Sequence, residues 1–235
     1  MKVITRLLIP LMLWVPGSGQ TIRPAVKAQH AKQYPDYHSG VNIFAETQAG
    51  KDVDRSIDKL PPLYAFDPSE NVAEYPDHEL RSIACDADAI LLGSPKTAET
   101  SVTESGDFLF TDYTFNVSSV IKASDSNPMA GSTIIVTRPG GATQINGHFV
   151  KTSTGNFPQF QFNELYLLFL RYLPKTNTYR AFRSGTFVIA PNGSVAPIDN
   201  TQKVQAKSAQ QKDAFLTEVR AAATASCSGI TRTLN

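Results

Sequence analysis

The stretch FLFTDYTFNVSSVIK, residues 108–122, decides the fold class of this chain. From Tyr113 onward, apolar or aromatic residues alternate with polar ones, which indicates a β-strand with one buried and one wet face. Phe108 and Phe110 have the opposite parity, so we expect a β-bulge near Thr111 that joins the two halves. The stretch therefore predicts a sheet that turns one face toward a core.

Further strands are predicted on both sides of this one. Residues 87–93 form the preceding strand, and Ser94–Asp107 either extends it into a hairpin or forms a loop. Pro139-Gly140-Gly141 ends the third strand, and Asn192-Gly193 is a strong two-residue hairpin signal. The later strands are expected over Thr133–Arg138, around His148–Thr152, and over Glu164–Tyr172, Tyr179–Arg183 and Thr186–Ala190.

Helical patterns flank this ladder of strands. A short helix is expected from Asp77 to about Cys85, and a longer one ends near Ser226. Ser208 and Gln211 have the spacing of a capping box at its start. The apolar stripe of the terminal helix consists of Phe215, Leu216, Val219, Ala222 and Ala223. The predicted fold is mainly β: a closed or partly open OB-like β-barrel with a short N-terminal helix and a C-terminal amphipathic helix, over residues 77–230.

The two cysteines of the chain, Cys85 and Cys227, stand at the two ends of this domain. In an exported chain, two cysteines most simply pair with each other. We favour a disulfide, with two free buried thiols as the alternative.

Residues 1–20 have the features of a secretory signal peptide. Lys2 and Arg6 supply positive charge, an apolar run follows, and small residues lie before the expected cleavage after Gly19 or Gln20. A membrane anchor is the alternative, but the apolar run is shorter than the ~20 residues that a span requires. The mature protein is therefore expected to be secreted or periplasmic, without a transmembrane segment.

Residues 21–76 differ in composition from the rest of the chain. Apolar residues are scattered singly, with one weak cluster at Val41, Ile43 and Phe44. So little apolar surface does not offset the entropy of ordering the chain, which predicts a flexible arm or spacer.

The charge balance argues against one class of partner. The chain has 22 Lys+Arg and 21 Asp+Glu, and loss of Lys2 and Arg6 with the signal peptide leaves 20 against 21, a net charge of −1. Without a basic run, this composition predicts no nucleic-acid binding.

The order of these segments resembles an OB-type barrel of the netrin-module and TIMP-like kind, and also exported bacterial proteins with this pattern. Four segments carry the resemblance, which extends over about 140 of the 235 residues: residues 87–93, 111–122, 131–136 and 163–170. The resemblance implies a fold. It does not carry metalloprotease inhibition, because TIMP-type inhibitors chelate the target's zinc through a mature N-terminal cysteine, and Cys85 lies far from the cleavage site.

No constellation for catalysis, a cofactor or a metal stands out in the sequence. The histidines, His30, His38, His78 and His148, have no metal-ligand spacing, and no Gly-x-Ser-x-Gly elbow surrounds Ser94 or Ser132. Asp86 and Asp88 are interpreted as a helix end and a polar strand face, with acid–base work or calcium binding as the alternative. Asp77-His78-Glu79 is interpreted as a charged helix start, with a weak surface metal contact as the alternative. Arg138-Pro139-Gly140-Gly141 is interpreted as a turn that releases a strand. We therefore predict no catalytic, cofactor or metal residues.

Phe157, Phe160 and Phe162 alternate with polar residues in the long Gly140–Asn163 segment. We favour a lid that packs back on the barrel over an exposed patch for a partner. The sequons at Asn116 and Asn192 are interpreted as a wet strand position and a turn position.

Three functions remain open at this point. The leading hypothesis is a secreted, non-enzymatic binding module for a protein or cell-envelope partner, which presents Ser94–Asp107 and Gly140–Asn163 to its ligand. The alternatives are an envelope hydrolase with an acidic site, which His148 beside an acid would favour, and a structural spacer.

Overall fold

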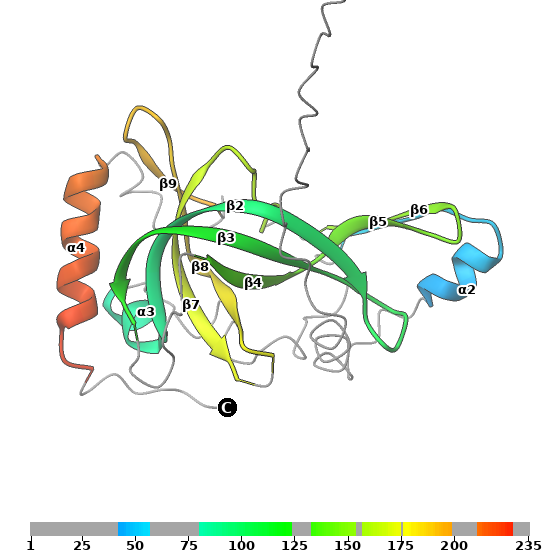
Figure 1. The fold of residues 1–235 in the computed structure, drawn as a ribbon, viewed down its shortest axis with the longest axis horizontal. Coiled ribbons are helices and arrows are strands. Elements are labelled where there is room, and N and C mark those ends of the chain that lie inside the picture. The colour runs from blue at the N-terminus through cyan, green and yellow to red at the C-terminus, as the bar shows by residue number, and fades with distance from the viewer. Residues whose placement is uncertain are drawn as a thin grey trace, which may run out of the picture.

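The computed structural model describes residues 42–56, 80–123, 133–153, 157–174, 176–198 and 211–227. These residues form a mainly β molecule with short helices (Figure 1). The helices are α2 (Ile43–Gln48), α3 (Leu80–Asp86) and α4 (Lys212–Thr224). The strands are β1 (Val53–Ser56), β2 (Ala89–Val102), β3 (Leu109–Lys122), β4 (Thr133–Pro139), β5 (Gly141–Ile145), β6 (His148–Ser153), β7 (Leu165–Leu173), β8 (Thr178–Ile189) and β9 (Val195–Pro197).

The larger sheet has six strands in the order β4-β3-β2-β7-β8-β9. Neighbours along this order are antiparallel, and β4 also pairs in parallel with β8 through Val136↔Tyr179 and Thr137↔Arg180. That last pairing closes a ring of five strands, from β4 through β3, β2 and β7 to β8. The predicted mainly β fold, with a short helix before it and an amphipathic helix after it, is confirmed.

Two apolar clusters cover the two faces of the sheet at β2, β7 and β8, which explains why β7 and the start of β2 are nearly continuous runs of apolar residues. The cluster inside the ring contains Ala89, Leu91, Tyr113, Phe115, Ile134, Val136, Phe157, Phe160, Tyr166, Leu168, Leu170, Tyr179, Ala181 and Ile198. The cluster between the ring and the helices α3 and α4 contains Ile83, Ala84, Ala87, Ile90, Leu92, Leu167, Phe169, Phe182, Phe187, Ile189, Val195, Phe215, Leu216 and Val219.

The first two strands of the ring form one long hairpin. Ser94–Asp107 extends the first strand, as in the hairpin alternative, because β2 continues to Val102 and pairs with Leu109. The expected bulge near Thr111 is wrong, since the pairing of Thr100 with Thr111 lies in a regular stretch and the register shifts fall nearer the start of β2. The change of parity has another cause: every residue from Leu109 to Phe115 is buried, so both faces of β3 are covered there.

The two strands predicted over Tyr179–Arg183 and Thr186–Ala190 are halves of one strand, β8. Its pairing with β7 slips between Leu168↔Thr186 and Leu170↔Ala181, which separates the halves. A hairpin at Asn192-Gly193 is confirmed, because β9 returns antiparallel to β8. Its loop is not the predicted two-residue turn, since the N–H of Ala190 donates to the Ser194 carbonyl at 2.9 Å and three residues lie between them. Gly193 there has a φ of +84°, a conformation in which glycine is unstrained.

Helix α4 packs on the ring through the predicted apolar stripe, since Phe215, Leu216 and Val219 are buried. The predicted capping box is wrong: Ser208 lies outside the described residues, and Gln211 is the N-cap residue without a side-chain capping bond. The N–H of Lys212 instead donates to the Gly193 carbonyl at 2.8 Å. The β8–β9 hairpin therefore anchors the start of this helix.

Cys85 in α3 and Cys227 after α4 lie at disulfide distance, with their Cα atoms 5.6 Å apart. This is the pairing predicted from the sequence. Arg81 of α3 also donates through Nη2 to the Ser226 carbonyl at 2.5 Å. The two helices are thus joined beside the ring, at the left of Figure 1.

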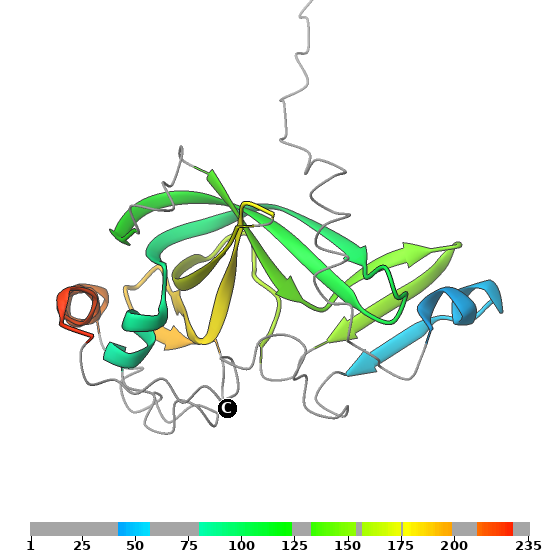
Figure 2. The same ribbon diagram turned by 90° about the horizontal axis from the view of Figure 1, so that it is seen from below.

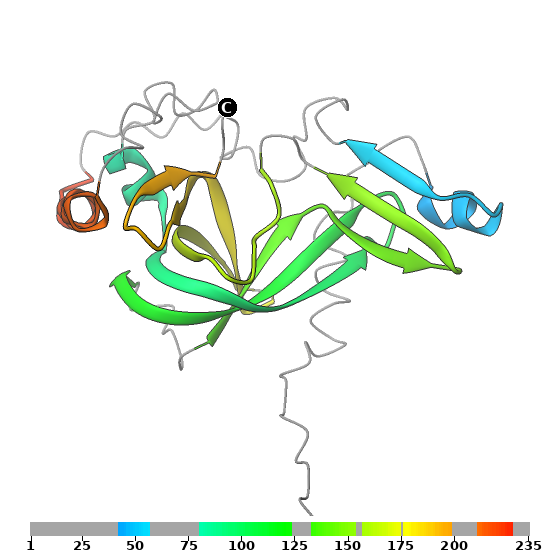
Figure 3. The same ribbon diagram turned by 90° about the horizontal axis from the view of Figure 1, so that it is seen from above.

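A second sheet lies at the opposite end of the molecule from α4, as the views from below and above agree (Figures 2 and 3). Its strand order is β1-β6-β5, with β5 and β6 antiparallel and β1 parallel to β6. Both β1 and α2 come from the predicted spacer, residues 21–76. For residues 42–56 that prediction is wrong, because Ile43 and Val53 are buried in a cluster with Leu109 and Val150. The rest of the spacer lies outside the described residues.

Candidate interaction surface

The two segments predicted to face a ligand, Ser94–Asp107 and Gly140–Asn163, meet at one end of the molecule. The first is the outer part of the β2–β3 hairpin, and the second contains the β5–β6 hairpin. Thr111 Oγ1 donates to the Gly140 carbonyl at 2.7 Å, and the hydroxyls of Thr100 and Thr111 lie 2.9 Å apart. Side-chain hydroxyls therefore join the two hairpins where the chain leaves the ring.

Two glycines make this junction possible. Gly140 has a φ of +81° and Gly141 a φ of +146°, both in the region that favours glycine. A Cβ on Gly141 would lie 2.2 Å from Thr111 Oγ1, so a side chain there meets the hydroxyl that holds the hairpins together. The predicted turn after the third strand is thus a junction that starts the second sheet.

A third segment, residues 42–56, completes this end of the molecule. The N–H of Ile43 donates to the Gly106 carbonyl in the β2–β3 turn at 2.7 Å, and Val53 pairs with Val150 of β6. The side chain of Asn42 caps α2 by accepting from the N–H of Ala45 at 3.0 Å. We call the assembly of α2, β1, β5, β6 and the β2–β3 turn the small-sheet end.

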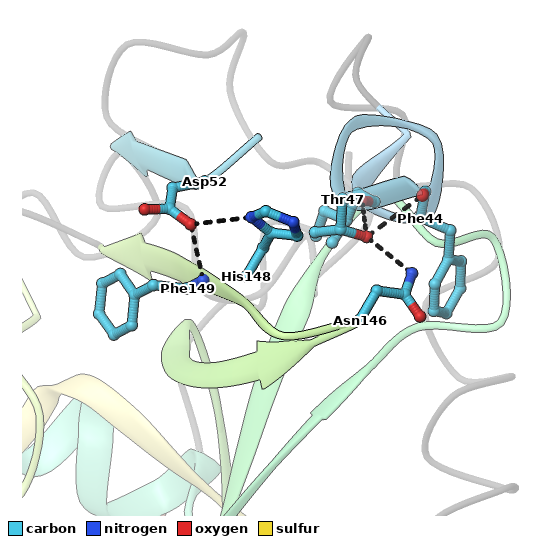
Figure 4. Close-up of polar contacts among 7 residues, drawn as sticks. Phe44, Thr47, Asp52, Asn146, His148 and Phe149 are labelled. Carbon is cyan, nitrogen blue, oxygen red and sulfur yellow. Dashed lines mark hydrogen bonds and ion pairs between the residues drawn. The ribbon is translucent and has the colours of Figure 1, made fainter. Parts of the chain in front are cut away.

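Asp52 connects the third segment to the start of β6 (Figure 4). Its Oδ1 lies 3.4 Å from Nδ1 of His148 and accepts the N–H of Phe149 at 2.9 Å. His148, at the start of the strand expected around His148–Thr152, begins β6 and stands beside a carboxylate. Within the described ranges, no group of three or more His, Cys, Asp or Glu side chains could hold a metal ion.

A second polar contact holds α2 on the β5–β6 turn (Figure 4). Nδ2 of Asn146 donates to Thr47 Oγ1 at 3.1 Å, and that hydroxyl donates to the Ile43 carbonyl at 2.9 Å. Asn146 and Gly147 have φ values of 53° and 81°, as a type I′ hairpin turn requires. Asn146-Gly147 is thus a second Asn-Gly hairpin signal in the sequence, which the prediction of a single short strand around His148 overlooked.

The small-sheet end exposes both aromatic and charged side chains. Phe149 of β6 is 45% exposed and Phe44 of α2 is 36% exposed. Beside Phe149 on the outer face of the sheet, Lys151 Nζ lies 3.8 Å from Asp54 Oδ2. Aromatic residues are enriched in protein–protein interfaces, in which the rim around the buried centre is polar.

The aromatic segment after β6 divides between the two predicted roles. Phe157 and Phe160 are buried inside the ring, as the lid alternative predicts, whereas Phe162 is 53% exposed. The ring of Phe160 makes edge contacts with Tyr113 and Tyr166, with centroids 5.0 and 4.9 Å apart. Phe157 and Phe160 therefore act as a fixed plug of the ring interior.

Arg138, interpreted from the sequence as part of a turn, is fully buried in β4. Its guanidinium donates to the carbonyls of Phe157 and Pro158 and lies 4.2 Å above the ring of Phe157. Burial lowers the pKa of Arg138 to about 10, against the opposing effect of Tyr113. These hydrogen bonds and the ring contact partly compensate for burial of the charge, and they hold Phe157 and Pro158 in position.

Two tyrosines complete this buried network. Tyr113 donates to Oε1 of Gln159, and the Tyr166 hydroxyl donates to Oε2 of Glu164 at 2.5 Å while accepting the N–H of Gln161 at 2.7 Å. Burial is the main reason that the pKa of each tyrosine is raised. No periodicity or motif could have revealed this network, because its members come from four separate segments.

The remaining candidate residues are not gathered into one site. Asp86 ends α3, and Oδ2 of Asp88 accepts the N–H of Tyr172 at 2.8 Å, a structural role. Asn116 is exposed on β3, and Asn192 lies in an exposed turn, where it accepts from the Ser194 N–H at 3.0 Å. His30, His38, His78, Asp77, Glu79 and Ser132 lie outside the described residues.

No protein-family model matches the chain, and no curated protein matches it. Of the helices that the structure describes, none has the length and apolar character needed to cross a membrane.

Proposed function

We propose that this protein is an exported, non-enzymatic interaction module that contacts a protein or cell-envelope partner through its small-sheet end. The observation that carries the proposal is the convergence of three segments, distant in sequence, at the end opposite α4. Their side chains place the exposed ring of Phe149 beside the Asp54–Lys151 pair. Export rests on the signal-peptide pattern of residues 1–20, and the Cys85–Cys227 pair suits an oxidising compartment.

We also propose that the ring is an OB-type barrel, as in the netrin-module resemblance. Three consecutive antiparallel strands, β2, β3 and β4, are followed by β7, which returns beside β2, and this is a Greek-key arrangement. OB folds are five-stranded, partly open Greek-key barrels that bind ligands through one strand face and the adjoining loops. The near-neutral charge favours a protein or envelope component over nucleic acid.

The test compares one exposed phenylalanine in the surface with one outside it. Tagged mature protein and its Phe149→Ser and Phe162→Ser variants would be incubated with the native extracellular and envelope fractions, and captured partners quantified by mass spectrometry. Both substitutions remove an exposed ring, so they have similar effects on solubility. We expect a defined partner to be lost by at least tenfold with Phe149→Ser alone, since removal of a central aromatic anchor typically costs about 1.4 kcal/mol or more.

Equal recovery of every captured protein with the two variants would contradict the proposal that a partner binds the small-sheet end. Recovery of no partner, together with turnover of a substrate, would contradict the non-enzymatic role.

One observation favours the hydrolase alternative, because His148 does stand beside an acid. In that mechanism His148 would be the general base, oriented by Asp52. The Asp52 side chain is 69% exposed, so water competes for the pair and weakens it. A screen with pooled ester, glycoside and peptide substrates tests this alternative, and activity that is lost in His148→Gln would support it.

A further inference from the structure

Residues 42–56 attach to the small-sheet end as a separate piece of chain. Four residues of this segment are hydrogen-bonded to the β2–β3 turn or to the β5–β6 hairpin. Ile43 donates its N–H to the Gly106 carbonyl. Thr47, Asp52 and Arg55 accept hydrogen bonds from Asn146, Phe149 and Ser153. The β1 ladder is parallel, from Val53↔Val150 to Ser56↔Ser153. By contrast, β5 and β6 are joined by their own two-residue turn. The hairpin is therefore a local unit, and β1 is a strand added to its edge from far away in the sequence.

Strand addition to a sheet edge is a general mode of peptide recognition. Main-chain hydrogen bonds provide affinity, and alternate side chains provide specificity. Here Val53 enters the cluster with Ile43, Leu109 and Val150, while Asp54 faces Lys151 on the outer side. The edge of β6 therefore has the features of an acceptor site for an extended segment with an aliphatic residue between two carboxylates.

We infer that this acceptor site can be filled by residues 42–56 of a second copy of the chain, which gives a dimer by exchange of the segment. Residues 57–79 join the segment to α3 and, at about 3.3–3.6 Å per residue, have a contour length of roughly 80 Å. That length allows the segment to reach a neighbouring copy. Exchange needs no new contact, because each contact made within one chain is reproduced between two chains.

The charges of β1 argue against the simplest other dimer, in which two β1 edges pair with each other. In the symmetric antiparallel registers with the greatest overlap, either Asp54 faces Asp54 or Arg55 faces Arg55. Like charges directly opposite each other destabilise a strand pair. Exchange instead keeps the oppositely charged Asp54–Lys151 pair. A second copy is therefore expected to donate its segment rather than to extend the sheet.

The concentration dependence of exchange can be estimated. The effective concentration of a tethered segment is typically in the mM range, and at protein concentrations below this value docking within the chain dominates. At about 10 μM protein, roughly 1% of the acceptor sites would hold a segment from another copy, rising to about half at 1 mM.

The Asp54–Lys151 pair gives a direct test. Unlabelled and ¹⁵N-labelled mature chains, with the disulfide intact, are mixed in equal amounts, unfolded in urea, refolded together and treated with a carbodiimide. The reagent joins the Asp54 carboxylate to the Lys151 amine as an amide, with net loss of water to the carbodiimide. Glu46 and Lys51, 3.0 Å apart within the same segment, provide an internal control whose links never mix isotopes.

We expect about a quarter of the Asp54–Lys151 links to join an unlabelled to a labelled chain at 1 mM protein, against less than about 1% at 10 μM. Asp54→Asn should abolish these links and leave the Glu46–Lys51 links unchanged. The inference is wrong if, at 1 mM protein, every Asp54–Lys151 link joins residues with the same isotope label. It is equally wrong if sedimentation detects a dimer whose links do not mix, since another surface then holds that dimer. Neither result bears on the role proposed for Phe149.

Discussion

The ring with its helices and the small-sheet end are held together in different ways. Two large apolar clusters, one inside the ring and one under α3 and α4, stabilise the first region. The second has one buried cluster of four residues, against which Val102 and Ile145 pack. It also has polar contacts, of Asp52 with His148 and Phe149 and of Asn146 with Thr47. Apolar burial is the dominant favourable term in folding, so the ring should carry most of the stability. The small-sheet end should open first.

The largest expected effect comes from the covalent link beside the ring. The disulfide joins positions 142 residues apart, and the chain-entropy model gives about 4–5 kcal/mol for a loop of this length. We expect the Cys85→Ala/Cys227→Ala variant to lose roughly this free energy of unfolding in urea denaturation. A loss below ~1 kcal/mol would show that burial alone holds α4 in place. Thiol labelling of the native protein should detect no free cysteine.

Truncation of one core side chain in each region compares the two directly. Phe169 is fully buried against Phe187, and Phe169→Ala should cost about 3–5 kcal/mol through lost transfer energy and a cavity. Val150→Ala in the four-residue cluster should cost about 2 kcal/mol. Urea midpoints give both values. Equal losses would mean that the small-sheet end folds as tightly as the ring.

The junction between the regions is tested by a pair of glycines. Gly141→Ala adds a Cβ that meets Thr111 and requires a strained φ, for a cost of about 1–3 kcal/mol. Gly147→Ala is the matched control, because its φ is also positive but no atom lies within 4 Å of the new Cβ. Amide hydrogen exchange in β5 and β6 should be faster in Gly141→Ala than in Gly147→Ala. Equal effects would exclude the contact with Thr111 as the cause.

Loss of one polar contact should have a smaller and local effect. Asp52→Ala removes the acceptor for the N–H of Phe149 and the partner of His148, at a cost of about 0.5–1.5 kcal/mol. Amide exchange should increase in β1 and at Phe149 while the ring strands keep their protection. Faster exchange in β7 would contradict the independence of the two regions.

The smallest effect is a pH dependence of the free energy of unfolding, caused by two tyrosines of the ring. Burial raises the pKa of Tyr113 and Tyr166 above the ordinary value of 10.0. The folded state therefore holds these protons more tightly than the unfolded state. Their contribution to stability is complete below about pH 10 and is lost as the pH rises toward their folded pKa values. Absorbance titration of the folded protein should show tyrosines that ionise above the ordinary pKa of 10.0. The Tyr166→Phe variant should have one fewer of them, and the protein unfolded in urea should have none.

The sequence predicted the ring better than the small-sheet end because periodicity reports burial. The alternation from Tyr113, the apolar run of β7 and the stripe of α4 each reflect a face against a large core. Residues 42–56 carry no such pattern, since only Ile43 and Val53 face the small cluster. The hairpin signal at Asn146-Gly147 was present, but it could not show which strand adds to its edge. The bulge predicted near Thr111 failed for a related reason: both faces of β3 are covered there.

What the amino-acid sequence determined by itself is local or covalent: the positions of most strands, the amphipathic face of α4 and the two cysteines available for pairing. Tertiary structure alone decided that Arg138 is buried over Phe157, that the predicted spacer adds a strand to β6, and that three distant segments meet at one end. The physical reason is that periodicity and turn chemistry act over a few neighbouring residues. The partner of an edge strand or of a buried charge depends on which distant segments the complete fold brings together.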